Sequence, residues 1–150
     1  MNTNNQDRTG QNKQVVRRFF DVFNTHSQAG YDEIFSNDYV LDFPGGPGTA
    51  RGIAGLLKAS GEFLATFPDL HFTLDTVIAE GEYVAAFWTM QGHQEGPLGP
   101  IPGTGKPVTL TGTSLLRVVD GKIVEDRVRA DLIGLMQQIG AMPAPEPVGL

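Results

Sequence analysis

Apolar residues in the first third of the chain recur at the spacing of an α-helix. They fall on one side of a helical projection and are Val15, Val16, Phe19, Phe20 and Phe23. This pattern predicts an amphipathic helix that ends near Asn24. A short apolar group after Gly30 predicts a second helix, and a third is indicated by Ile53, Leu56, Leu57, Leu64 and Phe67, before Pro68-Asp69.

The remaining segments have the composition and punctuation of β-strands. A short extended segment, residues 39–43, stops at a run of proline and glycine, residues 44–48. Residues 71–79 and 83–91 are rich in β-forming side chains, with a short glycine-containing turn between them. Residues 93–106 hold too much glycine and proline for regular structure, so we expect a long loop there.

Residues 108–131 predict a hairpin whose turn is Asp120-Gly121, because Asp-Gly between alternating segments is a strong hairpin signal. A short apolar helix is predicted to follow from Leu132. Side chains alternate along a strand, so one face of the second strand carries Ile123, Glu125, Arg127, Arg129 and Asp131, and the other carries Val124, Asp126, Val128 and Ala130. Whether the charged row meets water or a pocket decides the function.

The order of the elements, helices first and strands afterwards, indicates an α+β fold with the helices on one face of a curved antiparallel sheet. A chain of 150 residues is about one domain long. We expect that domain over residues 13–140. A flexible polar tail, residues 1–12, precedes it, and a proline-rich tail, residues 141–150, follows it.

The composition narrows the classes of partner. A net charge of −6 with no basic run argues against nucleic acid. The chain has no cysteine, and His26, His71 and His93 lack the spacing of metal ligands, so we expect no metal site. No stretch approaches the length of a membrane span and the N-terminus has no apolar signal region, which favours a cytoplasmic protein with no membrane partner.

Two glycine-rich runs resemble nucleotide-binding loops but lack their key residues. Arg51 stands where a dinucleotide fingerprint after Gly46 needs its third glycine, and Pro107 stands where a phosphate loop ending at Lys106 needs serine or threonine. No serine lies in a nucleophile-elbow sequence. We therefore expect neither a bound cofactor nor covalent catalysis.

Four segments carry a family resemblance. They are NKQVVRRFFDVFN, FPDLHFTLDTVIAEGEYVAAFWTMQG, IPGTGKPVTLTG and LLRVVDGKIVEDRVRADLIGLMQQIG. In this order and spacing they resemble the SnoaL-like polyketide cyclase branch of the nuclear transport factor 2-like superfamily, over residues 13–140. The resemblance implies a cone, in which a strongly curved antiparallel sheet is closed at one end by helices and holds an apolar pocket. It also implies a homodimer formed through the outer face of the sheet.

The resemblance places Asp131 at the position of the general acid/base of polyketide ring closure. The row Glu125, Arg127, Arg129 and Asp131 then faces into the cone, provided that no β-bulge intervenes. An ion pair is the alternative for Asp131, because Arg129 is two residues away along the strand, about 7 Å. Asp42 is interpreted either as a second polar group at the pocket mouth or as a turn residue that caps the proline-glycine loop.

Several further residues are candidates for substrate binding, each with a simpler alternative. Trp88 and Met90 share a strand face and are expected to line the cavity, with core packing as the alternative, which applies to Phe19 as well. Glu125 and Arg127 either orient a polar substrate or pair with each other. His93 lies in the long loop and is otherwise an ordinary solvated residue.

This chain lacks most of the residues that define the neighbouring families of the same fold. Steroid isomerases use a base, an oxyanion-binding tyrosine and a second acid, and the corresponding positions here are Asp42, Phe19 and Ser114, so one role of the three is kept. Limonene-type epoxide hydrolases need arginine and aspartate on a central strand, and residues 83–91 contain neither. Close members carry a Gly-x-His-x-Gly loop, from which His93 is displaced by one position.

The sequence therefore predicts a cofactor-free acid/base enzyme, a SnoaL-like cyclase or isomerase, that acts on a hydrophobic, carbonyl-bearing small molecule by aldol-type or proton-transfer chemistry. A proton shuttle in an apolar cavity contributes about 10²–10⁴ in rate. A non-catalytic small-molecule binding protein of the same fold is the first alternative. A steroid-isomerase-like or epoxide-hydrolase-like activity is the second.

Overall fold

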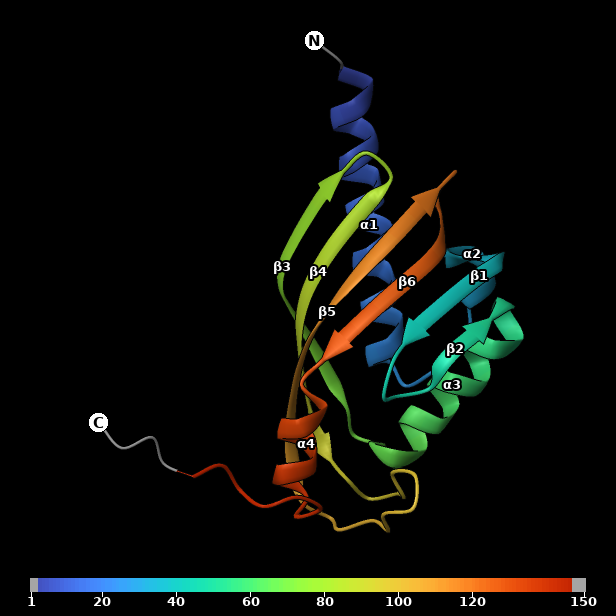
Figure 1. Cartoon of the computed structure of the whole chain (residues 1–150). Helices are drawn as coiled ribbons and strands as arrows, with labels where there is room; N and C mark the ends of the chain where they lie inside the picture. The colour runs from blue at the N-terminus through green and yellow to red at the C-terminus, as the bar shows by residue number, and fades with distance from the viewer. Residues whose placement is uncertain (1–2, 147–150) are drawn as a thin grey trace.

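The chain folds into a curved, open six-stranded sheet with helices packed on its concave side (Figure 1). The computed structural model describes residues 3–146. In chain order the elements are α1 (Thr3–Asn24), α2 (Tyr31–Ile34), β1 (Phe35–Phe43), β2 (Gly48–Arg51), α3 (Gly52–Thr66), β3 (His71–Glu80), β4 (Tyr83–His93), β5 (Pro107–Val119), β6 (Lys122–Ala130) and α4 (Leu132–Gln138). This architecture confirms the predicted α+β cone.

One strand pairing differs from the predicted antiparallel sheet. The strands lie in the order β2-β1-β6-β5-β4-β3, and β1 runs parallel to β6, whereas the other neighbours are antiparallel. Turn signals report only pairings between strands that are close in sequence. The β1–β6 pair joins the two ends of the domain, so no local pattern marks it.

Helix α1 is longer than its apolar pattern indicates. Residues 3–12, which were expected to form a tail, belong to the helix, and within them Asn12 is only 5% exposed. Its side-chain amide donates to the carbonyl of Gly81 at 3.4 Å. Adding residues to an existing helix is far easier than starting one, so a polar segment extends a helix that is held elsewhere by packing.

Residues after α4 contain no helix or strand up to residue 146, and residues 1–2 and 147–150 of the two expected tails lie outside the described part of the chain. No helix within residues 3–146 is both long and apolar enough to cross a membrane.

The turn between β5 and β6 has the geometry that its sequence predicts. Asp120 has φ 50° and Gly121 has φ 77°, which matches the two left-handed positions of a type I′ turn. Aspartate and glycine tolerate this backbone conformation better than other residues. The predicted hairpin is therefore confirmed.

A β-bulge interrupts β6 shortly after this turn. Arg117 of β5 pairs with Glu125, but Val118 pairs with Ile123, which leaves Val124 as an extra residue on β6. One extra residue exchanges the two faces of a strand for everything beyond it.

The bulge turns the charged row away from the interior. Asp126 and Val128 are buried on the concave face, while Arg127 and Arg129 are exposed and Glu125 is half-buried on the convex face. The row was expected to face the cone interior only if no β-bulge intervened. Val124 forms such a bulge, so Glu125, Arg127 and Arg129 face outward.

The long loop between β4 and β5 is organised around one buried side chain. Gln94 is fully buried; its Nε2 donates to the carbonyls of Gly96 and Pro102, both at 3.1 Å, and its Oε1 accepts from the hydroxyl of Thr104 at 2.6 Å. The segment has no helix or strand, as predicted, yet its backbone is tied at several points to this amide.

Replacing Gln94 by alanine is expected to destabilise the fold by about 2–4 kcal/mol, because the change removes the several hydrogen bonds of a fully buried amide and leaves a cavity in its place. Urea unfolding of Gln94→Ala measures the loss. Gln91→Ala on exposed strand surface is the matched control. Equal stabilities of the two variants would show that Gln94 does not hold the loop.

Candidate active site around Asp126

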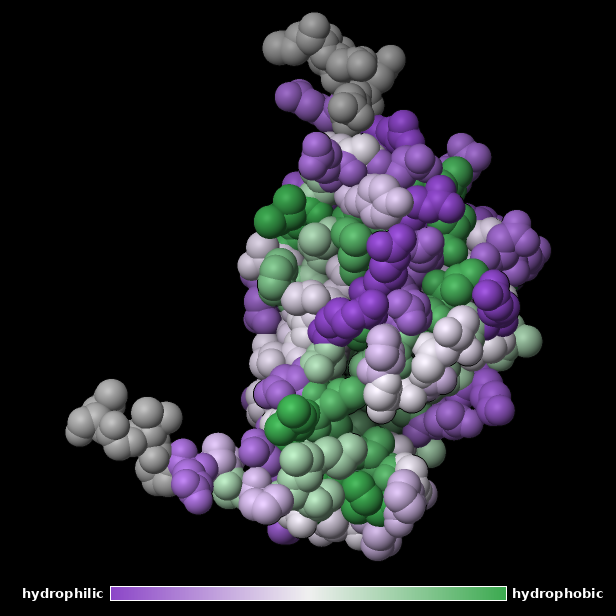
Figure 2. All heavy atoms as spheres, viewed as in Figure 1, coloured by the Kyte–Doolittle hydropathy of each residue, from purple (hydrophilic) through white to green (hydrophobic). Residues whose placement is uncertain are grey.

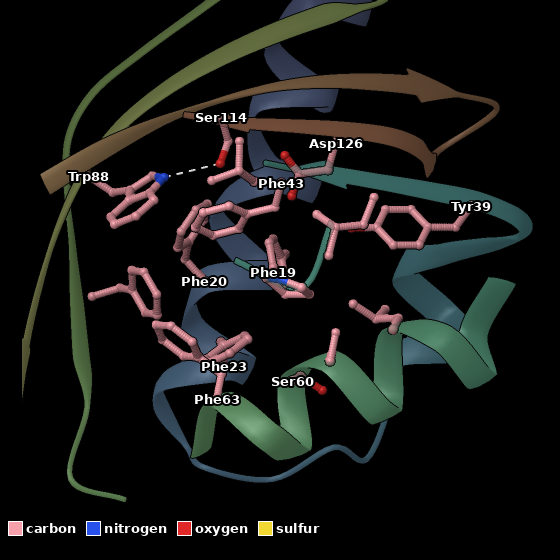
Figure 3. Close-up of a pocket in the computed structure, with 16 residues that line it drawn as sticks. Phe19, Phe20, Phe23, Tyr39, Phe43, Ser60, Phe63, Trp88, Ser114 and Asp126 are labelled. Atoms are coloured by element: carbon pink, nitrogen blue, oxygen red, sulfur yellow. Dashed lines mark hydrogen bonds between the residues drawn. The ribbon is translucent and has the colours of Figure 1, made fainter. Parts of the chain in front are cut away.

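A small cavity lies between the concave face of the sheet and helices α1 and α3 (Figure 3). Its volume is about 80 Å³. Half of the residues in its wall are aromatic, and they come from α1, α3, β1, β3 and β4: Phe19, Phe20, Phe23, Tyr39, Phe43, Phe63, Phe72 and Trp88. The polar lining, apart from Tyr39 and Trp88, consists of Ser60, Ser114 and Asp126.

Most of the aromatic pairs in the wall pack edge to face, while Phe63 and Phe72 are stacked. Phe72 lies 5.2 Å from Trp88 and 5.3 Å from Phe23, in both cases near perpendicular. This arrangement is the favoured one for aromatic pairs. The amide of Asn24 brings α1 to the sheet edge by bonding both backbone groups of Phe72, at 2.7 and 2.9 Å.

Trp88 occupies a position that a glycine on the next strand makes possible. Its strand partner is Gly112, and a Cβ built there would lie 2.5 Å from the indole ring. The indole Nε1–H donates to the hydroxyl of Ser114 at 3.1 Å, and both residues are buried. The largest side chain of the cavity is thus held by a hydrogen bond as well as by packing.

Asp126 is a carboxyl group enclosed by this apolar wall. It is 3% exposed, and its Oδ1 has no hydrogen-bond partner among the described residues. Burial raises the pKa of Asp126 from 3.8 to about 7, although the adjacent Ser114 hydroxyl acts in the opposite direction. Asp126 therefore exchanges a proton near neutral pH, which suits a general acid/base.

Tyr39 is the other titratable side chain in the cavity wall. Burial, followed by the negative charge of Asp126 and then by Tyr31, raises the pKa of Tyr39 well above its ordinary value. Its hydroxyl consequently stays protonated and neutral at physiological pH, so the cavity contains one group that changes charge.

A second, larger chamber of about 610 Å³ adjoins the small cavity. The two share four wall residues, Phe43, Pro47, Ala59 and Phe63. The rest of the chamber is mostly apolar and is formed by the end of α3, the loop at residues 97–101 and α4. Figure 2 shows apolar side chains gathered at this end of the molecule, over α4 and the neighbouring loop. We call the small space the inner cavity and the larger one the outer chamber.

The charged candidates from the sequence lie outside the inner cavity. Asp131 is exposed and caps α4, where its Oδ1 accepts from the backbone N–H of Gly134 at 2.9 Å. Arg129 pairs with Asp42 at 3.1 Å, not with Asp131, and Arg127 pairs with Glu125 at 2.8 Å. These pairs lie on the convex side of the sheet.

Some of the uncharged candidate residues line the inner cavity and others do not. Trp88, Phe19 and Ser114 line the inner cavity. Met90 is fully buried on the same strand face as Trp88 but is absent from the cavity wall. His93 lies at the end of β4, half-exposed, and its Nδ1 contacts the carboxylate of Asp69 at 2.6 Å. Among residues 3–146 no group of three or more histidine, aspartate or glutamate side chains is arranged to hold a metal ion.

Asp126 is the site residue that the sequence reasoning missed. The strand face that carries it also carries Val124, Val128 and Ala130, so it is more apolar than the face with the charged row. An apolar face is normally the buried one. A single carboxylate on that face was therefore a usable signal for a buried acid.

The folded-state pKa of Asp126 predicts a pH-dependent stability. Because the folded protein binds this proton more tightly than the unfolded chain, the free energy of unfolding should fall as pH rises from about 4 to about 7 and then level off, at up to about 1.4 kcal/mol per pH unit. Asp126→Asn should remove that slope, as measured by urea unfolding from pH 4 to 9. The exposed Asp38→Asn controls for loss of charge; a wild-type slope in Asp126→Asn would contradict the assignment.

Comparisons with known proteins identify the family of this chain. The family model for SnoaL-like polyketide cyclase matches residues 13–139. Nogalonic acid methyl ester cyclase of Streptomyces nogalater is 30% identical over 85% of this chain and 96% of its own length. Aklanonic acid methyl ester cyclase DauD of Streptomyces sp. strain C5 is 27% identical over 90% of this chain and 84% of its own.

A solved structure supports the same relationship. The crystal structure of a proposed SnoaL-like polyketide cyclase from Jannaschia sp. CCS1 superimposes with a TM-score of 0.82 at 25% identity, covering 90% of this chain and 95% of that one. The likeness therefore extends over most of both folds. The chain belongs to the SnoaL-like polyketide cyclase family.

Proposed function

We propose that this protein is a cofactor-free cyclase in which Asp126 moves the proton during ring closure of a hydrophobic, carbonyl-bearing substrate. The observation that carries the proposal is a buried carboxyl group with one free oxygen in an aromatic cavity. Membership of a polyketide cyclase family supports ring closure over other proton transfers.

The proposed reaction is an intramolecular aldol addition. Ionised Asp126 takes a proton from a carbon next to a carbonyl, and the resulting enolate attacks a second carbonyl of the same molecule. One carbon–carbon bond forms, and the new alkoxide takes the proton back from Asp126. A pKa of about 7 lets the same group act first as base and then as acid, while the apolar walls limit competing water.

The substrate class follows from the named relatives and from the size of the site. The relatives are cyclases of nogalonic and aklanonic acid methyl esters, so polycyclic polyketide methyl esters are the first compounds to test. The inner cavity of about 80 Å³ accepts only the reacting part of such a molecule, and the outer chamber of about 610 Å³ accepts the remainder. Phe43 and Phe63 line both spaces, so they lie where the two parts of the bound molecule would join.

Asp131, the acid/base residue expected from the family resemblance, is the competing proposal. Its exposed position at the start of α4 accounts for an aspartate there through helix capping alone. The two proposals differ in which carboxylate must be lost to stop turnover, and conservative amide substitutions separate them.

Asp126→Asn should lower kcat/KM for ring closure by about 10²–10⁴, because the amide cannot take up the substrate proton. Asp131→Asn should keep nearly wild-type turnover, since the asparagine oxygen still accepts from Gly134. Trp88 is the only tryptophan, so quenching of its fluorescence reports ligand binding independently of turnover. The opposite ranking of the two variants would assign the shuttle to Asp131.

We also propose a homodimer through the convex face of the sheet. Four large apolar side chains are exposed on that face, which we call the outer patch: Ile78, Tyr83, Phe87 and Leu115. Ile78 and Leu115 both pair with Ala85 of the central strand between them, so the patch is continuous across β3, β4 and β5. Contiguous exposed apolar surface is typical of association sites.

The isomerase chemistry and the cytoplasmic location that the sequence suggested remain predictions.

Phe87→Glu should weaken the dimer by at least about tenfold, because an aromatic contact in an interface centre is replaced by an unpaired charge. Sedimentation equilibrium over a range of protein concentrations measures the change. Ile133→Glu is the control, since Ile133 is equally apolar and 62% exposed but lies on α4. A monomeric wild-type protein, or equal effects of the two changes, would argue against this interface.

A further inference from the structure

Two polar side chains that the proposed reaction does not use lie in a row with Asp126: Ser114 next to it, and Trp88 beyond Ser114. Ser114 of β5 pairs with Val128 of β6, and Leu116 pairs with Asp126, so Ser114 and Asp126 are diagonal neighbours on the concave face. Figure 3 shows the Ser114 hydroxyl and the Asp126 carboxyl side by side, with Trp88 on the far side of the serine. The three residues thus form a row from β4 to β6.

A hydrogen bond from Trp88 sets the orientation of the Ser114 hydroxyl. An indole N–H only donates, so at 3.1 Å it takes a lone pair of Ser114 Oγ and leaves the hydroxyl proton free. Packing against Phe72 and close approach to Gly112 hold the indole in that place. Trp88 therefore fixes the direction in which Ser114 can donate.

The free hydroxyl proton needs an acceptor because Ser114 is 3% exposed. Within residues 3–146 no backbone carbonyl accepts a hydrogen bond from it. The carboxyl group of Asp126 is the charged acceptor on the neighbouring strand, and its Oδ1 stays without a partner. One oxygen of Asp126 can thus be engaged by Ser114 while the other is left for the substrate.

We propose that Ser114 is a positioning residue for Asp126: held by Trp88, its hydroxyl supports the ionised carboxylate and leaves Oδ1 free toward the cavity. This inference rests on the proposed role of Asp126. It is supported by the effect of the Ser114 hydroxyl on Asp126, whose pKa it lowers against the larger opposing effect of burial. A serine that only packed against its neighbours would not change the proton affinity of Asp126.

Few other groups can influence this titration. Tyr39 of β1 is the other titratable side chain in the wall of the inner cavity, and α1, α3, β3, β4 and β5 contribute none. Tyr39 stays neutral at the relevant pH because burial raises its pKa. A change in the pKa of Asp126 on substitution of Ser114 would therefore report the serine hydroxyl itself.

The test is a carbon-13 NMR titration of the Asp126 carboxyl in protein with labelled aspartate, without substrate, using Asp126→Asn to assign the signal. Ser114→Ala should raise the pKa of Asp126 by about one unit, a tenfold change in proton affinity. Ser114→Thr should keep the wild-type value, and Trp88→Phe should shift it upward by less than Ser114→Ala. A folded Ser114→Ala protein that titrates like the wild type would overturn the inference.

Gly112→Ala tests the same contact without removing a polar group. The added Cβ meets the indole, so Trp88 should leave Ser114, its fluorescence emission should change and the pKa of Asp126 should rise. Gly10→Ala is the control, because open space surrounds a Cβ at that position of α1. Displaced indole emission with an unchanged pKa would contradict the role given to Trp88.

Activity measurements keep this inference separate from the proposed function. If Asp126 is the shuttle, the acidic limb of the pH profile of kcat/KM should move upward in Ser114→Ala by the same amount as the NMR titration. A shifted titration in a protein without cyclase activity would leave the role of Ser114 intact and overturn the proposed function. If turnover depends on Asp126 but the pKa of Asp126 is the same in Ser114→Ala as in the wild type, the role of Ser114 is overturned and the proposed function stands.

Discussion

The bulge at Val124 is the constraint on which the site depends. Regular alternation from the buried Ile123 onward would place Glu125, Arg127 and Arg129 under the helices. Each buried ion costs several kcal/mol unless it is well paired. The extra residue instead sends these charges to the convex face, where they form ion pairs in contact with water, and admits one carboxyl group to the interior.

That carboxyl group reduces the stability of the fold it belongs to. An unpaired buried oxygen costs roughly 1–3 kcal/mol, and the aromatic wall around Asp126 offers no compensating cation among its lining residues. The surrounding structure is correspondingly firm. Three sets of contacts restrain the elements that border the two spaces. They are the edge-to-face packing of Phe72 on Trp88, the hydrogen bonds between Asn24 and β3, and the hydrogen bonds of Gln94 within the long loop. A stable frame thus holds an unfavourable group in a defined place.

Local features of the fold were well predicted by the sequence, and features that depend on distant segments were not. The apolar period of α1 and the Asp120-Gly121 turn have local causes, so their signals are readable. The parallel pairing of β1 with β6, and the capture of residues 3–12 by α1, depend on contacts that no short pattern contains.

The candidate site followed the same division. Trp88 was a candidate because of its strand face, and Phe19 and Ser114 were candidates because they correspond to steroid isomerase positions; all three line the inner cavity. Their role in substrate binding remains a prediction. The charged residues lie on the convex face because Val124 is inserted into β6, and the alternation that starts at Ile123 predicts their face only where no bulge intervenes. Such an insertion leaves little trace in a nine-residue strand, although the greater apolarity of the Asp126 face was present in the sequence.

The central position of β6 also has a consequence for how the protein is made. This strand lies between β1 and β5, so before it is synthesised the chain can form only two separate pieces of sheet, β1 with β2 and β3 with β4 and β5. Pairings between distant segments are slow to form. The pairing of β6 with β1 joins the two pieces of sheet, and the same strand carries Asp126. A nascent chain therefore has no buried Asp126 carboxyl group until its last strand has paired with β1 and β5.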